Sequence, residues 1–205
     1  ADTELAGASI RETAIGPDQT FYVACNKTPS GPGGLWKRTP RGHWVDISPK
    51  PEHAVSTSFW SIAIDPNNPQ LLVALCQGGK GFVSHDQGGS WSPRGFTMSS
   101  DDIRWIGQQE SYWMSVGECV FDPAGHLWFA EGFGVWQTSE LDSTNLDWQE
   151  ESAGIEETCG NEVIAPPGGA PVGAMWDVGV FRFSDQNSYT AERGFAYFMS
   201  AWSLD

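Results

Sequence analysis

The chain has 205 residues, enough to bury a sizeable core in one domain or two small ones. Only 18% of the residues are charged, while there are 24 glycines, 11 tryptophans and 11 phenylalanines, a composition that favours strands and tight turns over helices. The formal net charge of −15 argues against nucleic acid and anionic membrane surfaces as partners, because both require a basic surface.

The sequence also argues against a membrane span, a metal site and a cofactor. No apolar run approaches the ~20 residues of a membrane-spanning helix. The four cysteines are widely spaced, without a C-x-x-C pair or a histidine cluster. The sequence is compatible with two states of these cysteines: a Cys119–Cys159 disulfide, or four buried free thiols. The acidity suits a neutral or cationic partner, or the solubility of a secreted protein, and we expect an extracellular location.

Four segments share one plan: an apolar strand that runs into proline, a second short apolar strand, a Gly-rich loop and a third strand. They are 13–17, 21–24 and 34–37, then 61–66, 71–75 and 81–84, then 118–123, 127–130 and 134–137, then 162–166, 172–176 and 179–182. Successive prolines, at 17, 66, 123 and 166, are 49, 57 and 43 residues apart. This spacing is close to the ~40–50 residues of a four-stranded propeller blade.

We therefore predict an all-β fold, with a single β-propeller region over 1–205. The repeats are expected at approximately 10–49, 58–95, 114–152 and 158–205. About four blades form an incomplete ring, since propellers close with typically 4–8 blades and both ends of this chain are ragged. Unpaired edge strands would then favour self-association, or pairing with the missing remainder of the propeller.

The second repeat contains S-x-D-x-G-x-x-W at 84–91, the pattern of an Asp-box (BNR-like) turn. From Ser84, the chain enters a turn in which Asp86 can accept backbone N–H bonds and Gly88 allows a positive φ. Trp91 would fold back as a hydrophobic plug. A catalytic Asp86 is the alternative, but we interpret these residues as a structural marker of the blade.

The loops between second and third strands should emerge on one rim of the propeller. Two of them carry a carboxylate, Glu131 and Asp177. Asp177 follows Trp176, and an aromatic ring beside a carboxyl suits a sugar-cleaving site, because rings stack on sugar C–H faces while the acid protonates the leaving oxygen. A turn-capping role is the alternative for Asp177. Aromatic residues that could bind sugar, or belong to the core, are Trp60, Trp105, Trp113, Phe133 and Trp176.

Three motifs follow one another towards the C-terminus: G-I-E-E-T at 154–158, N-E-V-I-A-P-P-G-G-A-P at 161–171 and W-D-V-G-V-F-R at 176–182. Upstream lie G-G-L-W-K at 33–37, G-H-W-V-D-I-S-P at 42–49 and F-V-S-H-D-Q-G-G-S-W-S-P at 82–93. In this order they resemble glycoside hydrolase family 74, xyloglucan-active endo- and exo-glucanases built from two seven-bladed propellers. The resemblance covers nearly the whole chain and implies later blades of the N-terminal propeller.

The resemblance implies inverting hydrolysis of a β-1,4-glucan such as xyloglucan, with Asp177 as the general acid and no cofactor. The family's general base lies in an R-T-D-x-G-G segment, which this sequence lacks, so the chain alone is expected to be inactive. Three departures from the family pattern affect the site: Trp176 and Val180 replace glycines, and Glu162 replaces an aspartate. A stiffer loop and a bulky ring beside the acid would shift specificity or abolish activity.

Two other functions fit the same residues less well. A non-catalytic Asp-box propeller would bind polysaccharide or protein without releasing reducing ends. A sialidase would need an arginine cluster for the substrate carboxylate, whereas the seven arginines here are scattered and the net charge is strongly negative.

Overall fold

The computed structural model describes residues 3–50, 58–76, 80–103, 105–106, 116–155, 158–185, 187–190, 193–194 and 200–204. These residues form sixteen strands and no α-helix. Accordingly, no helix in the described ranges is long and apolar enough to cross a membrane. The all-β fold predicted from the sequence is confirmed.

The strands fall into four successive groups of four, and each group is one propeller blade. Blade 1 contains β1 (Ser9–Ile15), β2 (Phe21–Asn26), β3 (Gly34–Arg38) and β4 (Val45–Asp46). Blade 2 contains β5 (Phe59–Ile64), β6 (Leu72–Cys76), β7 (Lys80–Ser84) and β8 (Ser92–Ser99). Blade 3 contains β9 (Cys119–Phe121), β10 (Leu127–Glu131), β11 (Gly134–Thr138) and β12 (Asn145–Glu150). Blade 4 contains β13 (Gly160–Ile164), β14 (Val172–Met175), β15 (Gly179–Arg182) and β16 (Arg193–Gly194).

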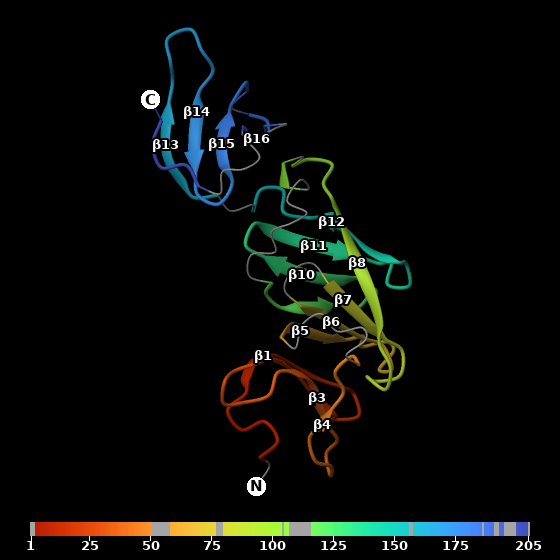
Figure 1. Ribbon diagram of the computed structural model, residues 1–205. Coiled ribbons are helices and arrows are strands. Elements are labelled where there is room, and N and C mark those ends of the chain that lie inside the picture. The colour runs from red at the N-terminus through yellow and green to blue at the C-terminus, as the bar shows by residue number, and fades with distance from the viewer. Residues whose placement is uncertain are drawn as a thin grey trace.

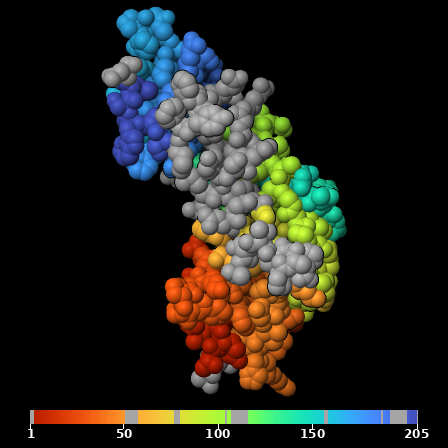
Figure 2. All heavy atoms as spheres, in the orientation of Figure 1, coloured from red at the N-terminus to blue at the C-terminus, as the bar shows by residue number. Residues whose placement is uncertain are grey.

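Neighbouring strands within each blade run antiparallel, and blades 2 and 3 are fused into one sheet. The fusion is a parallel pairing of their last strands, β8 and β12, from Asn145 opposite Gly95 to Gln149 opposite Ser99. Figure 1 shows blade 1 at one end of the molecule, blades 2 and 3 in the middle and blade 4 at the other end. The same succession is visible on the surface in Figure 2.

The turn after the first strand is stabilised by an aspartate in three blades. In blade 3, Asp122 accepts hydrogen bonds from the backbone N–H groups of Ala124 and His126, at 2.8 and 2.9 Å. In blade 2, Asp65 accepts a hydrogen bond from the Asn67 backbone N–H, and in blade 1, Asp18 accepts one from the Thr20 backbone N–H. The adjacent proline has no N–H, so the strand ladder stops there and the side chain supplies the bonds that the turn needs.

The Ser84–Trp91 turn has the local geometry expected of its spacing. Asp86 accepts bonds from the Ser90 backbone N–H and hydroxyl, both at 2.7 Å, and these bonds hold the pKa of its carboxyl below the ordinary value. Gly88 has a φ of 83°. The buried Trp91 donates through Nε1 to the Ile47 carbonyl, 2.5 Å away. The turn thus joins blade 2 to blade 1.

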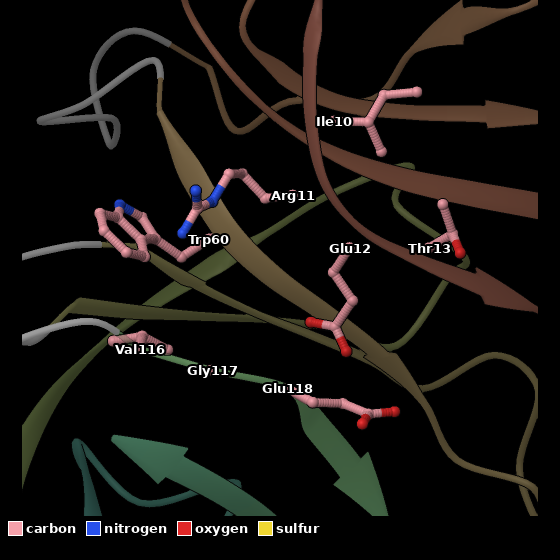
Figure 3. A pocket seen from close by; sticks show the side chains of 8 residues that line it. All are labelled: Ile10, Arg11, Glu12, Thr13, Trp60, Val116, Gly117 and Glu118. Atoms are coloured by element: carbon pink, nitrogen blue, oxygen red, sulfur yellow. The ribbon is translucent and has the colours of Figure 1, made fainter. Parts of the chain in front are cut away.

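The first strands of blades 1, 2 and 3 are joined by one side chain, that of Glu12 in β1 (Figure 3). Its Oε2 accepts the backbone N–H of Ile62 in β5 at 3.0 Å, and its Oε1 accepts that of Cys119 in β9 at 3.2 Å. Burial raises the pKa of Glu12 to about 8, and the nearby Glu118 carboxylate adds to the shift. We call this arrangement the Glu12 clamp.

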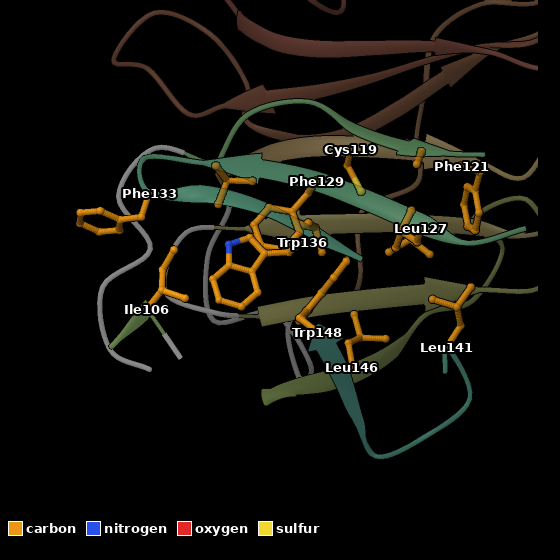
Figure 4. Close-up of a cluster of buried hydrophobic side chains, with 14 of the residues drawn as sticks. Ile106, Cys119, Phe121, Leu127, Phe129, Phe133, Trp136, Leu141, Leu146 and Trp148 are labelled. Carbon is orange, nitrogen blue, oxygen red and sulfur yellow. The ribbon is translucent and has the colours of Figure 1, made fainter. Parts of the chain in front are cut away.

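The main core lies between the fused blades 2 and 3 (Figure 4). Trp148 of β12 packs edge-on against Phe129 of β10 at 4.5 Å and against Phe96 of β8 at 5.9 Å between ring centroids. The outer side of the β8–β12 seam is polar, and Ser99 Oγ donates to Gln149 Oε1 at 3.0 Å. Apolar packing inside and side-chain hydrogen bonds outside therefore hold the last strands together.

Gly88 offers a direct test of how blade 2 docks on blade 1. A Cβ at Gly88 would lie 2.7 Å from Ile47 Cδ1, whereas a Cβ at Gly125, whose φ is 91°, would meet nothing within 4 Å. Both alanine variants incur the backbone penalty of about 1–2 kcal/mol, but only Gly88→Ala adds overpacking of about 1–3 kcal/mol. Chemical denaturation should give the larger loss of stability for Gly88→Ala, and equal losses would contradict the docking role.

Candidate functional site

Asp177 lies at the centre of the tight turn between β14 and β15. Its φ is 60°, in the left-handed region that residues with side chains seldom adopt. The Val178 N–H donates to the Trp176 carbonyl at 2.6 Å, two residues back, which closes a γ-turn around Asp177. A γ-turn with a positive central φ is rare and strained. The fold therefore holds the half-buried Asp177 in an unfavourable backbone conformation at the rim of blade 4.

Two exposed tryptophans lie beside this turn. The side chain of Trp176 is 40% exposed and that of Trp202 is 67% exposed, and their ring centroids are 4.8 Å apart with an edge-to-face angle of 61°. The segment 200–204 is fixed to blade 4 by three hydrogen bonds from or to its backbone. They are Ala201 N to Met175 O, Asn161 Nδ2 to Ala201 O, and Leu204 N to Glu162 Oε2. The Ser200 hydroxyl also accepts the Asp177 N–H at 3.3 Å.

Sequence reasoning missed Trp202 because it follows the last recognisable strand of the repeat. The only signal was its position at the end of a β-rich, aromatic stretch. Its proximity to Trp176 depends on the return of the segment 200–204 to β13 and β14, and the repeat alignment does not contain that segment. Exposed tryptophan pairs of this kind offer C–H-stacking surface for sugars.

Glu131 occupies the equivalent rim of blade 3, at the end of β10. Its Oε1 accepts the Phe133 backbone N–H at 3.1 Å and Trp136 Nε1 at 3.2 Å. Its Oε2 is buried without a hydrogen-bond partner among the described residues. Burial raises the pKa of Glu131 to about 7, although the hydrogen bonds at Oε1 oppose the shift. One oxygen is therefore used by the turn, and the other stays buried without a partner.

The remaining aromatic candidates differ in exposure. Trp105 is 4% exposed and packs edge-on against Phe181, and Phe133 is 5% exposed. Both pack in the core, and Trp105 also lines a small cavity of about 150 Å³ beside Phe181. Sugar binding by either residue stays a prediction. Trp60 is half-buried, with the Arg11 guanidinium 4.3 Å from its ring centroid. Trp113 lies outside the described residues.

The strand register places the candidate residues on one side of the blades. Glu131 is opposite Gly134 and Met175 is opposite Gly179, so Glu131 and Asp177 occupy corresponding turns of blades 3 and 4. The first strands begin at this same rim, since Ser9 pairs with Asn26 at the end of β2. The arrangement can supply carboxyls and exposed rings from several blades to one face.

The cysteines and potential metal ligands give no second site. All four cysteines are free thiols, three of them buried and Cys159 exposed, so the Cys119–Cys159 disulfide is not formed. The described part of the chain contains no group of three His, Cys, Asp or Glu side chains that could hold a metal ion.

The four-stranded blades, their joined first strands and their rim turns define the chain as a β-propeller protein. No family model matches it. A xyloglucanase of Acetivibrio thermocellus is 25% identical over 196 residues, which cover 76% of this chain and 23% of that enzyme. A family 74 xyloglucanase structure from Xanthomonas campestris is 26% identical, covers 97% of this chain and 31% of its own, and has a TM-score of 0.78.

A family 74 enzyme from Niastella koreensis has the same fold, with a TM-score of 0.78 at 20% identity over 94% of this chain and 31% of its own. The resemblance to glycoside hydrolase family 74 is therefore confirmed: over most of its length the chain is similar to part of those enzymes. It spans about a quarter of the curated relative and about a third of the solved chains.

The two raised pKa values predict how stability depends on pH. The folded protein keeps the Glu12 proton up to about pH 8 and the Glu131 proton up to about pH 7. An unfolded chain loses both near pH 4.3, so the folded state binds more protons in between and stability falls as pH rises. Each carboxyl can contribute a slope of up to about 1.4 kcal/mol per pH unit.

Chemical denaturation between pH 4 and 9 measures this slope. Glu12→Gln and Glu131→Gln should each flatten it, whereas the exposed Glu140→Gln should leave it unchanged. A wild-type stability that rises with pH across this window would contradict the assignment.

Proposed function

We propose that this chain contributes the general acid and part of the substrate-binding surface of a glycoside hydrolase that acts on a β-1,4-glucan such as xyloglucan. One observation carries the proposal: Asp177 is held at a positive φ in a strained γ-turn beside two exposed tryptophans. Strain of this kind clusters at functional sites, because surrounding contacts must maintain it against the local preference of the backbone. The resemblance to family 74 implies the same role for Asp177 and supports the proposal.

In the proposed reaction, the protonated Asp177 carboxyl donates its proton to the glycosidic oxygen as the C–O bond breaks. A water molecule attacks the anomeric carbon from the opposite face and gives its proton to a second carboxylate. Inversion requires the two carboxyls to lie ~6.5–9.5 Å apart, so that the water fits between them. The second carboxylate is expected in an R-T-D-x-G-G segment, which these 205 residues lack, so the complete site needs residues from elsewhere.

Trp176 and Trp202 would bind the glucan beside the acid. Their rings can stack on pyranose C–H faces, while the acidic surface, with a net charge of −15, is compatible with an uncharged polysaccharide. Glu131 is a second rim carboxyl that would line the substrate-binding surface beside Asp177, with its unpartnered oxygen buried beneath the turn. An Asp-box role for the Ser84–Trp91 turn and extracellular action on plant-type polysaccharide belong to the same proposal.

Asp177→Asn removes the transferable proton and keeps a residue that tolerates positive φ. In the gene product that contains this chain, reducing-sugar release from xyloglucan should fall by at least about a hundredfold, the range of general acid catalysis. Circular dichroism should show an unchanged fold. Near-normal rates with a folded variant would exclude Asp177 as the acid.

Asp177→Gly tests whether the strained conformation at Asp177 serves activity at the expense of stability. Glycine adopts this φ without penalty, so the variant should be about 1 kcal/mol more stable than the wild type and inactive. Gln19, with a φ of 64°, is the matched control: Gln19→Gly should stabilise to a similar extent without changing activity. A destabilised Asp177→Gly variant would mean that the carboxyl holds the turn together, as a capping residue would.

The second candidate function is a non-catalytic propeller that binds polysaccharide, which the exposed Trp176–Trp202 pair would also serve. It predicts binding of xyloglucan fragments by this chain, with no release of reducing ends from xyloglucan, cellulose or mixed-linkage glucan by the complete gene product.

A further inference from the structure

A cavity of about 410 Å³ opens beside the Glu12 clamp, at the start of the first strands of blades 1, 2 and 3. Arg11, Glu12, Trp60 and Glu118 supply its functional groups (Figure 3). Its size falls within the range of small-ligand sites. We call it the bulge pocket, because of the irregularities in the strands that line it.

The same backbone feature aims Arg11 and Trp60 into this pocket. In β1, Ile10 pairs with Cys25 and Glu12 with Ala24, so Arg11 is an extra residue in a β-bulge. In β5, Phe59 pairs with Cys76 and Ser61 with Leu75, which makes Trp60 the extra residue there.

Blade 3 approaches the pocket with a similar irregularity. The Gly117 N–H donates to the Ala130 carbonyl at 2.7 Å, while the Ala130 N–H donates to the Glu118 carbonyl at 3.4 Å, so two residues again face one. Bulges are frequent beside active sites because they turn a side chain away from its regular direction. Three blades thus use the same device to direct different side chains to one place.

The chemistry of the pocket suits an uncharged, polyhydroxylated ligand. Arg11 provides N–H donors, Glu118 provides an exposed carboxylate acceptor, and Trp60 provides an apolar edge. The guanidinium is held over the Trp60 ring by a cation–π contact, which fixes the donors without neutralising them. A cationic ligand would be repelled by Arg11 and an anionic one by the Glu118 carboxylate, whereas sugar hydroxyls can bond to both kinds of group.

We propose that the bulge pocket is a carbohydrate-binding subsite, separate from the Asp177 turn, that holds a neutral pyranose unit through Arg11, Glu118 and Trp60. Its ligand class rests on the proposed function, since the pocket opens at the rim from which Glu131 and Asp177 also project. Glu12 forms the floor of the subsite and positions it by fixing the three strands to one another.

Binding of cellotetraose and of a xyloglucan heptasaccharide, measured by isothermal titration calorimetry on this chain, tests the proposal. Glu118→Gln and Trp60→Ala should each weaken binding by at least about tenfold, the value of one good polar or stacking contact. Glu118 is exposed and its side chain makes no hydrogen bond or ion pair with another described residue, so its variant should remain folded. Matched controls are the exposed Glu140→Gln and Arg41→Ala, which should bind like the wild type.

The outcomes separate this proposal from the catalytic one. Asp177→Asn and Trp176→Ala should retain the bulge-pocket contribution, so that Glu118→Gln still weakens binding in their background. Oligosaccharide binding that is unaffected by Glu118→Gln and Trp60→Ala would overturn the subsite, even if Asp177→Asn abolished hydrolysis. Tighter binding of a uronic-acid oligosaccharide than of the neutral one would overturn the ligand class of the bulge pocket. Loss of activity only in Asp177→Asn would leave the proposed catalytic function intact.

Discussion

A single carboxyl joins three blades at the centre of this molecule. Glu12 accepts one backbone N–H from β5 and one from β9, and the residues it links are separated by up to 107 positions in the chain. Buried backbone donors need partners, and the side chain supplies them where neighbouring first strands are too far apart to pair. Burial raises the pKa of Glu12 to about 8 although these two hydrogen bonds favour the ionised form, so the folded state gains stability towards acidic pH.

The proposed binding surface depends on this clamp, because the side chains that would form the surface come from different blades. Arg11 and Trp60 reach the bulge pocket together only if β1 and β5 stay side by side. Glu131 and Asp177 likewise depend on strand pairing. Each lies where the second strand of its blade turns into the third, at the end of the blade where the first strand begins. Regular hydrogen bonding forms the scaffold, and the bulges and the strained turn set the directions of the candidate side chains.

Much of the fold could be predicted from local sequence. The Asp-Pro ends of β5 and β9 and the spacing of Ser84, Asp86 and Gly88 dictate turns whose hydrogen bonds form within a few residues. Asp177 could be placed on a rim turn for the same reason, although nothing in its neighbours indicated the positive φ that the structure gives it. The fusion of blades 2 and 3 through β8 and β12 could not be predicted, because it is a parallel backbone pairing of strands 50 residues apart, supported by side-chain hydrogen bonds such as Ser99 to Gln149.

The sequence by itself determined the all-β architecture, the four-strand repeat and the resemblance to family 74, because strand periodicity, proline stops and turn motifs are local properties. Only the tertiary structure decided which aromatic rings are available. Trp105 and Phe133 are aromatic residues of the kind that can stack on sugars, but they are buried. Trp202, outside the repeat, lies exposed beside Trp176. Exposure is set by which blade packs against which, and that depends on contacts such as the Glu12 clamp between residues far apart in the chain.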